Sequence, residues 1–199
     1  MGRVLSPQQW LDRHYAGRDF RFAPASEDAS FRRYFRVTTA EGTRILMDAP
    51  PEREDCRPFL KVARLFGAAG VHVPEVLAED LDNGYLLLSD LGSQTYLQAL
   101  DAGNAAQLYD QATSALVSIQ LASRGGVLPE YDRALLLREL QLFPDWYIRR
   151  HLGVELSAAQ AKTIADVFER ILGNNLAQPR VYVHRDYHSR NLMVSAPNP

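Results

Sequence analysis

Apolar and polar positions in the first half of the chain follow the spacing of short strands. Residues 31–38 alternate aromatic or aliphatic side chains with arginines, which predicts a strand with one polar face. A turn at 40–43 and a second strand at 44–48 would complete a hairpin. Residues 85–89 are apolar without alternation, so that strand should be buried on both faces. Residues 20–28 are mixed in character, and we expect irregular structure there.

Helix signals accompany these strands. Ser6 followed by Pro7 predicts a helix start, because serine caps the first turn and proline suits the first helical position. Trp10 and Leu11 should then face inward. Residues 54–69 place apolar side chains on one helical face, which predicts a second helix.

Turn and breaker residues separate that helix from the apolar strand. Residues 71–78 contain Pro74, which indicates a connector or an edge strand. Asn83-Gly84 is a hairpin signal, because both residues tolerate a positive φ angle.

The second half of the chain has the periodicity of helices. Three long helices are predicted, at 105–123, 135–152 and 157–172. Pro144 should divide or kink the second of these helices. Short apolar runs at 181–183 and 192–194 predict strands on either side of a polar loop.

A strand-rich half thus precedes a helix-rich half, which predicts an α+β fold with two lobes meeting at a cleft. We place the N-terminal nucleotide-binding lobe at 1–91, with an antiparallel sheet plus a helix. A partial helical C-terminal lobe should occupy 92–199.

Composition excludes several classes of protein. The formal net charge is −2 and no long basic run occurs, so a nucleic-acid partner is disfavoured. A single cysteine, Cys56, excludes an internal disulfide and fits a reducing cytoplasm. No apolar stretch approaches the roughly 20 residues of a membrane span, and nothing at the N-terminus resembles an export signal. We expect a cytoplasmic protein without a membrane partner.

The candidate chemistry lies in the octet His-Arg-Asp-Tyr-His-Ser-Arg-Asn at 184–191. A catalytic Asp followed five positions later by a metal-binding Asn is the loop pattern of phosphoryl transfer. Asp186 would orient the attacking hydroxyl and take its proton, and Asn191 would bind Mg²⁺. Alternatively, the spacing is accidental, with His184 merely hydrogen-bonded and Asn191 merely a turn residue. The flanking strands and the upstream element order favour the functional interpretation.

These motifs resemble the aminoglycoside phosphotransferase and choline kinase branch of the protein-kinase-like fold. Within that branch the chain is most similar to the bacterial N-acetylmuramate/N-acetylglucosamine kinases, the anomeric sugar kinases of cell-wall recycling. The resemblance is carried by Ala-Ser-Phe-Arg-Arg-Tyr-Phe-Arg at 29–36, Ile-Leu-Met-Asp-Ala-Pro-Pro at 45–51, Leu-Leu-Ser-Asp-Leu-Gly at 87–92, Leu-Phe-Pro-Asp-Trp-Tyr at 142–147 and the octet. The octet is specific to the superfamily, and the other stretches narrow the resemblance to the subfamily.

This resemblance implies an ATP site under the first hairpin. The residues implied to face the phosphates are Ser30, Phe31, Arg32 and Arg33, and those of the hinge beside adenine are Ser89, Asp90 and Leu91. Backbone N–H groups and a guanidinium would hold phosphate oxygens. The alternatives are a solvated hairpin and an ordinary strand end.

The chain also departs from the kinase pattern. A lysine is expected at the end of the second strand, where Met47 and Asp48 stand instead. The helix that follows has no acidic residue between Cys56 and Gly70 to serve as its partner. The candidates to replace the lysine are Arg32, Arg33 and Arg44, with Lys61 as an outside choice.

The resemblance further implies a second metal-binding Asp downstream of the loop, which the residues after Asn191 do not supply. We therefore expect either that these 199 residues are part of a longer product or that a partner segment completes them, with little activity from the 199 residues alone. One of the loop residues Tyr187, His188 and Arg190 would contact a substrate carboxylate, and Arg190 is best suited by its charge. Alternatively, Arg190 pairs with a nearby acidic group. Trp146 and Tyr147 could stack on a sugar, although positions in the core are favoured.

The leading functional hypothesis is an ATP-dependent kinase, with Mg²⁺, that phosphorylates the anomeric hydroxyl of a small amino sugar. A choline- or aminoglycoside-type kinase is a close alternative. A nucleotide-binding pseudokinase that serves as an interaction module is a third hypothesis. The missing Lys–Glu pair supports the pseudokinase, whereas the intact Asp186 and Asn191 argue against it.

Overall fold

The computed structural model describes residues 3–27 and 31–196. The chain forms two compact units, one comprising Met1–Ile119 with Arg185–Pro199 and the other Gln120–His184. The predicted lobe boundary at 91 does not coincide with this division and stays a prediction. The loop at 184–191 therefore belongs, from Arg185 onward, to the same unit as the sheet.

The first unit contains a five-stranded sheet of order β1-β2-β3-β5-β4. Its strands are β1 Phe20–Glu27, β2 Arg33–Thr39, β3 Gly42–Asp48, β4 Val76–Asp80 and β5 Tyr85–Ser89. Every neighbouring pair is antiparallel. The predicted hairpin, the edge strand after Pro74 and the apolar strand at 85–89 are all confirmed.

Strand β1 corrects the expectation of irregular structure at 20–28. It pairs with β2 from Phe20↔Thr39 to Glu27↔Arg33, with a register shift between Pro24 and Ser26. Proline cannot donate to the ladder and is confined to edge strands or bulges, and β1 is both an edge strand and bulged. Because of Pro24 the sequence pattern did not predict a strand here, although pairing with β2 completes one.

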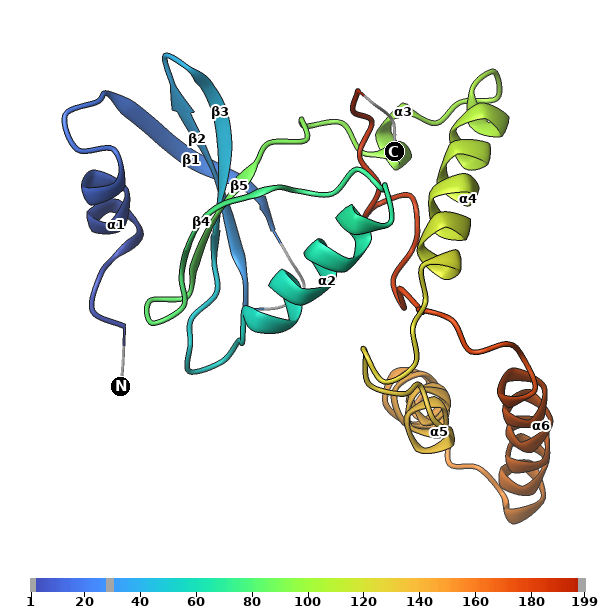
Figure 1. The fold of residues 1–199 in the computed structure, drawn as a ribbon. Helices are drawn as coiled ribbons and strands as arrows, with labels where there is room; N and C mark the ends of the chain where they lie inside the picture. Colours follow the sequence, from blue (N-terminus) through green and yellow to red (C-terminus); the bar gives the residue numbers. More distant parts are fainter. Residues whose placement is uncertain (1–2, 28–30, 197–199) are drawn as a thin grey trace. The chain divides into compact units, whose positions relative to one another are not determined.

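Helices α1 (Pro7–His14) and α2 (Arg57–Ala68) cover opposite faces of the sheet (Figure 1). Trp10 and Leu11 of α1 pack with Tyr85 and Leu87 of β5. Leu60 of α2 packs with the intervening strand residues Leu86 and Leu88. Successive strand side chains point to opposite faces, so an apolar run without alternation is what a strand between two helical layers requires.

Local signals place the start of α1 and the β4–β5 turn correctly. Ser6 accepts from the Gln9 N–H and forms a capping box with it. Gly84 has φ 71°, and a Cβ added there would lie 1.9 Å from the Ala49 carbonyl oxygen. That position thus requires glycine for both conformation and space.

The short helix α3 (Tyr96–Ala99) and the start of α4 (Ala105–Leu121) complete the first unit. Tyr96, Leu108 and Ala112 form a buried cluster to which Tyr187 and Leu192 add partly buried side chains. The predicted strand at 192–194 is reduced to a single bridge, Thr95↔Met193. This packing joins the segment after Asp186 to the residues that follow the sheet.

The second unit is helical, with α5 (Arg133–Leu142), a π-helix η1 (Phe143–His151) and α6 (Ala158–Leu176). Pro144 divides the long predicted helix, because it cannot donate the i→i−4 hydrogen bond. Arg133 pairs with Glu169 at 2.6 Å and links α5 to α6. Residues 181–183 form no strand, contrary to expectation: the Tyr182 N–H donates to Ser123 Oγ at 2.7 Å instead of to a ladder.

The aromatic residues of η1 also correct an expectation. Trp146 is 56% exposed and Tyr147 is 50% exposed, so neither occupies the core of the described chain. Pro144 and Ile148 are the buried residues of this helix. The Arg150 guanidinium lies 4.1 Å from the Trp146 ring centroid. No helix among the described residues combines the length and the apolar content needed to cross a bilayer.

Candidate active site in the loop 184–191

Asp186 and Asn191 converge, as their spacing predicts. The Asn191 side-chain N–H donates to Asp186 Oδ2 at 2.7 Å and to the Asp186 carbonyl oxygen at 3.0 Å. The Asn191 backbone N–H donates to the His188 carbonyl oxygen at 2.9 Å. The loop therefore curls so that the carboxylate and the carboxamide meet, while 69% of the Asp186 side-chain surface stays exposed.

The donor set fits Mg²⁺. Asn191 uses Nδ2 toward Asp186, which leaves its Oδ1 as the atom to face a cation. Within residues 3–27 and 31–196 there is no cluster of three or more His, Cys, Asp or Glu side chains that could hold a metal ion. Mg²⁺ commonly takes only one or two protein oxygens, and phosphate oxygens and water supply the rest. An amide oxygen beside a carboxylate matches this preference of Mg²⁺ for a small number of protein oxygens.

His188 contacts Asp186, whereas the sequence had indicated it only as one of three loop residues that would contact a substrate carboxylate. Its Nε2 lies 2.9 Å from Asp186 Oδ1, and its Nδ1 accepts from the Arg190 backbone N–H at 3.2 Å. The sequence signal for this contact is the two-residue separation of Asp186 and His188 within a loop, which allows the imidazole to approach the carboxylate. The side chain of Arg190 is exposed, and its backbone holds the imidazole.

The backbone just before Asp186 is strained. Arg185 has φ 72°, and it is the one residue other than glycine with a positive φ in the described part of the chain. The left-handed region costs a bulky residue about 1–2 kcal/mol. Such strain persists only where the surroundings impose it, and it is concentrated at functional sites.

Backbone hydrogen bonds hold the far side of the loop. The N–H groups of Tyr96 and Leu97 donate to the carbonyl oxygens of Leu192 and Ser189 at 2.8 and 3.0 Å. The Tyr187 hydroxyl donates to the Ala112 carbonyl oxygen at 2.6 Å. Burial raises the pKa of Tyr187, so this hydroxyl keeps its proton and its role as donor. The loop is thus anchored at three residues that follow Asp186, namely Tyr187, Ser189 and Leu192.

The residues predicted to face the phosphates are engaged in contacts within the hairpin region. Ser30 lies outside the described residues. Phe31 is 56% exposed, and its N–H points at Glu54 Oε1 at 3.4 Å. Arg32 pairs with Glu54 at 3.3 Å. Arg33 donates to Asp48 Oδ2 from Nε at 3.0 Å and from Nη2 at 2.5 Å.

Asp48, which stands where a lysine is expected, has a structural environment. Its side chain is fully buried and is ion-paired with Arg3 and Arg33. The Arg3 guanidinium also lies over the Tyr85 ring, 4.5 Å from the centroid. Burial raises the pKa of Tyr85 to about 12, which marks the surroundings of Asp48 as poorly hydrated. Met47 is buried against α2 on the other face of the sheet.

The predicted hinge is pinned by hydrogen bonds. Asp90 accepts from Arg36 Nε at 2.7 Å and Nη2 at 3.2 Å, and from the Gly92 N–H at 2.9 Å. Burial alone would raise the pKa of Asp90, but these hydrogen bonds outweigh it and the pKa is lowered. Ser89 Oγ accepts from the Glu75 N–H at 2.8 Å, and Leu91 is half-buried. These hydrogen bonds hold Ser89 and Asp90 in place, and the contact of this segment with adenine stays a prediction.

A family model described as "Phosphotransferase enzyme family" matches residues 21–199. The chain belongs to the phosphotransferase enzyme family. Curated relatives named N-acetylmuramate/N-acetylglucosamine kinase share 60% identity over 88% of this chain in Pseudomonas aeruginosa and 51% over 88% in Pseudomonas putida. A relative of that name from Neisseria meningitidis is 45% identical over 100% of the chain. The resemblance noted from the motifs is confirmed.

The chain spans 52% of the length of each Pseudomonas relative and 60% of the Neisseria relative. Among solved structures, the aminoglycoside phosphotransferase APH(4)-Ia matches with a TM-score of 0.63 at 16% identity, covering 96% of this chain and 67% of the other. A thermostable mutant of APH(4)-Ia in a ternary complex with ADP and hygromycin B matches with a TM-score of 0.62 at 15% identity, covering 98% of this chain and 68% of the other. This likeness confirms the α+β, protein-kinase-like fold of this phosphotransferase-family chain.

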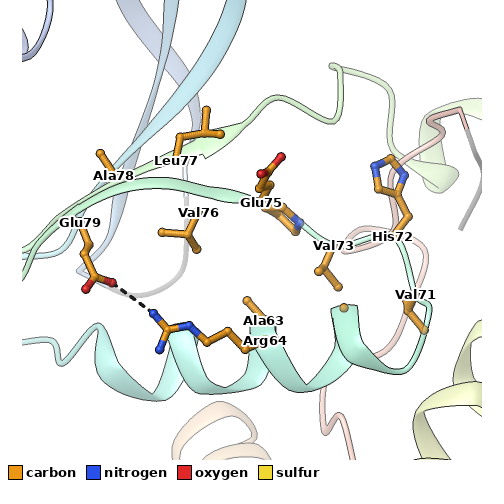
Figure 2. A pocket seen from close by; sticks show the side chains of 12 residues that line it. Ala63, Arg64, Val71, His72, Val73, Glu75, Val76, Leu77, Ala78 and Glu79 are labelled. Atoms are coloured by element: carbon orange, nitrogen blue, oxygen red, sulfur yellow. Dashed lines mark ion pairs between the residues drawn. The ribbon is translucent and has the colours of Figure 1, made fainter.

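A cavity of about 560 Å³ lies away from these residues, between α2 and β4 (Figure 2). Ala63 and Val76 line it from the two elements, and Arg64 pairs with Glu79 across it at 3.6 Å. None of the residues predicted to bind nucleotide, metal or substrate lines this cavity. Phosphoryl transfer depends on a positioned base and a metal ligand, and the loop 184–191 supplies such groups whereas the lining of this cavity does not.

Proposed function

We propose that this chain supplies the nucleotide-binding and catalytic-loop parts of an ATP-dependent sugar kinase. Its acceptor is the anomeric hydroxyl of N-acetylmuramate or N-acetylglucosamine. The observation that carries the proposal is the contact between Asp186 and Asn191 in an exposed, anchored loop. The names of the 45–60% identical relatives support the choice of acceptor. A cytoplasmic location, where ATP is abundant, belongs to the same proposal.

In the proposed reaction the anomeric oxygen forms a bond to the γ-phosphorus while the bond to the bridging oxygen of ADP breaks. Asp186 aligns the hydroxyl and accepts its proton, and ADP leaves. Asn191 Oδ1 would be a protein ligand to Mg²⁺, which when bound would neutralise charge on the phosphates. The described residues 31–33 together with Ser30 would lie at the phosphates, and the residues 89–91 at the adenine.

The arginines that are candidates to replace the missing lysine differ in the groups that they contact. Arg32 and Arg33 face the carboxylates of Glu54 and Asp48, which neutralise much of their charge. Arg44 donates to the neutral Thr43 carbonyl oxygen at 2.7 Å. It pairs in register with Ser89, which places Arg44 at the predicted adenine end of the site. Arg32 and Arg33 adjoin the turn predicted to face the phosphates, and Arg33 pairs in register with Asp48, so these two are the better placed candidates.

The experiment measures sugar phosphate formation by the full gene product that carries this chain, with Mg-ATP and a panel of sugars. N-acetylmuramate and N-acetylglucosamine should give the highest kcat/KM, and choline and aminoglycosides should give no product. The 199-residue chain, which covers about half of each Pseudomonas relative, should turn over slowly in parallel assays. Preferred turnover of choline or of an aminoglycoside would replace the proposed acceptor.

Arg190 offers a sharper test of the acceptor site. N-acetylmuramate carries a carboxylate and N-acetylglucosamine does not. Arg190→Ala should therefore raise KM for the first sugar by about tenfold, the value of one charge-assisted contact, and leave KM for the second unchanged. Arg150→Ala is the control, because Arg150 is engaged with Trp146. Equal changes in KM for both sugars would remove Arg190 from the proposed site.

A pseudokinase module is the second candidate, because a buried and paired Asp48 stands in the place of the usual lysine. That candidate requires nucleotide binding without phosphoryl transfer. Calorimetric titration of the gene product with Mg-ATP, followed by the sugar panel, separates the two. Binding without any sugar phosphate would favour the module over the kinase.

A further inference from the structure

His188 contacts Asp186 in a way that assigns its tautomer. The Arg190 backbone N–H donates to His188 Nδ1 at 3.2 Å. A backbone N–H can only donate, so Nδ1 must offer a lone pair and carry no proton. In a neutral imidazole the proton then resides on Nε2, the nitrogen that lies 2.9 Å from Asp186 Oδ1. The loop backbone thereby aims one N–H of the imidazole at the catalytic carboxylate.

The Asp186 carboxylate is then held by donors on both oxygens. His188 Nε2 donates to Oδ1, and Asn191 Nδ2 donates to Oδ2 at 2.7 Å. Rotation of the carboxylate about its Cβ–Cγ bond would break both hydrogen bonds. A carboxylate has about four lone-pair sites, so two donors do not exhaust its capacity to accept from a substrate hydroxyl.

Exposure makes this restraint necessary. The side chains of Asp186 and His188 are 69% and 48% exposed, so packing does not restrict the carboxylate as it would in a core. An Asp that must accept a proton from a bound hydroxyl has to hold one orientation, and a misplacement of 1 Å can cost about a hundredfold in rate. Directed hydrogen bonds are the means available to an exposed loop.

We infer that His188 is a positioning residue: its Nε2–H orients the Asp186 carboxylate toward the acceptor hydroxyl. The inference rests on the proposed function of Asp186 as the base in sugar phosphorylation. If His188 only shaped the loop, the important contact would be the hydrogen bond from the Arg190 N–H to His188 Nδ1. The inference instead assigns the role to the contact between His188 Nε2 and Asp186.

Two variants separate these roles, because each keeps one of the two hydrogen bonds. In His188→Gln the side-chain amide nitrogen reaches the place of Nε2 and can still donate to Asp186. In His188→Asn the side-chain oxygen takes the place of Nδ1 and can still accept from the Arg190 N–H, but no donor reaches Asp186. The full gene product carries both variants, and thermal unfolding checks that each is folded.

Steady-state kinetics with Mg-ATP and N-acetylmuramate should show His188→Gln within about threefold of wild-type kcat. His188→Asn should lower kcat by about 10- to 100-fold with KM for both substrates unchanged. The inference is overturned if His188→Asn keeps the wild-type kcat, or if His188→Gln falls as far as His188→Asn. Wild-type protein that phosphorylates no sugar would instead refute the proposed function.

A spectroscopic measurement tests the geometry without any turnover. Imidazole ¹⁵N shifts of His188, assigned by comparison with His188→Gln, distinguish a protonated from an unprotonated nitrogen. The expected signature is a neutral ring with its proton on Nε2. A ring protonated on Nδ1 alone contradicts the contact with the Arg190 N–H and overturns the inference.

Discussion

Two aspartates in the same compact unit illustrate two uses of a carboxylate. Asp48, at the end of β3, has no exposed side-chain surface and is paired with the guanidinium groups of Arg3 and Arg33. Asp186, in the loop, is 69% exposed, and side-chain donors of His188 and Asn191 contact its two oxygens. The first carboxylate is buried between opposite charges, whereas the second is exposed and has its direction restrained by hydrogen bonds.

The difference shows that the position of a residue within a sequence motif is a poor guide to the chemistry of that residue. Met47 or Asp48 stands where the kinase pattern predicts a phosphate-binding lysine, and burial and two cations assign Asp48 to the framework. Removing one member of a buried ion pair leaves uncompensated charge, so such groups act on stability. An exposed carboxylate with neutral donors costs little to solvate and can accept a proton during a reaction.

The largest expected effect is on turnover. Asp186→Asn should lower kcat for sugar phosphorylation by about a thousandfold, because the amide cannot accept the hydroxyl proton. Its free energy of unfolding should stay within about 1 kcal/mol of wild type, since the site is exposed. Activity assays and urea denaturation of the gene product measure the two quantities. A variant that keeps its kcat would show that Asp186 is not the base.

The reverse result is expected at the sheet. Asp48→Asn should destabilise the folded chain by about 3 kcal/mol, because Arg3 and Arg33 lose the anion that neutralises them. Glu41→Gln is the matched control, since Glu41 forms an exposed pair with Arg18 at 3.4 Å. That control should change the unfolding free energy by at most about 1 kcal/mol. Equal losses of unfolding free energy in the two variants, measured by urea denaturation, would show that the ion pairs of Asp48 contribute no more to stability than an exposed pair.

Gly84 tests how tightly the residues around Asp48 are packed. Gly84→Ala should cost about 3 kcal/mol of unfolding free energy, combining the left-handed backbone with a collision against the Ala49 carbonyl. Gly70→Ala is the control, because Gly70 has φ 81° and no neighbouring atom within 4 Å of an added Cβ. The control isolates the backbone cost of about 1 kcal/mol. Similar losses of unfolding free energy in Gly84→Ala and Gly70→Ala would show that the β4–β5 turn can move to accommodate the added methyl group.

The smallest effect concerns Asp90, an acid that is paired but not fully buried from water. Its folded pKa is lowered, chiefly because the hydrogen bonds from Arg36 and Gly92 outweigh burial. The corresponding stability is complete above the ordinary pKa of an Asp and is lost as pH falls through the lowered value. Arg36→Met should therefore move the midpoint of acid unfolding to higher pH. Circular dichroism against pH measures this midpoint.

Arg18→Met provides the comparison for Asp90, because Arg18 pairs with Glu41 at an exposed site. It should leave the acid midpoint within error of wild type. An unshifted midpoint in Arg36→Met would mean that Arg36 does not set the pKa of Asp90.

Local rules predicted much of the fold. The capping box at Ser6, the glycine of the β4–β5 turn and the proline that divides the long helix act over a few residues, so the sequence reveals them. Strand β1 escaped prediction because its partner β2 completes a ladder that Pro24 interrupts locally. The apolar run at 181–183 was wrongly expected to be a strand, since a strand needs a neighbour that no local pattern specifies.

By itself the sequence determined the identity of the loop, because a carboxylate and a carboxamide five residues apart need only one bend to meet. It could not determine which charges neutralise which. Arg3 and Asp48 are 45 residues apart, and Arg36 and Asp90 are 54 apart, so only the folded sheet brings each pair together. Hydrogen bonds within a turn follow from covalent geometry, whereas ion pairs between distant segments depend on how the strands pack. For that reason the tertiary structure alone distinguished the framework carboxylate from the one available for chemistry.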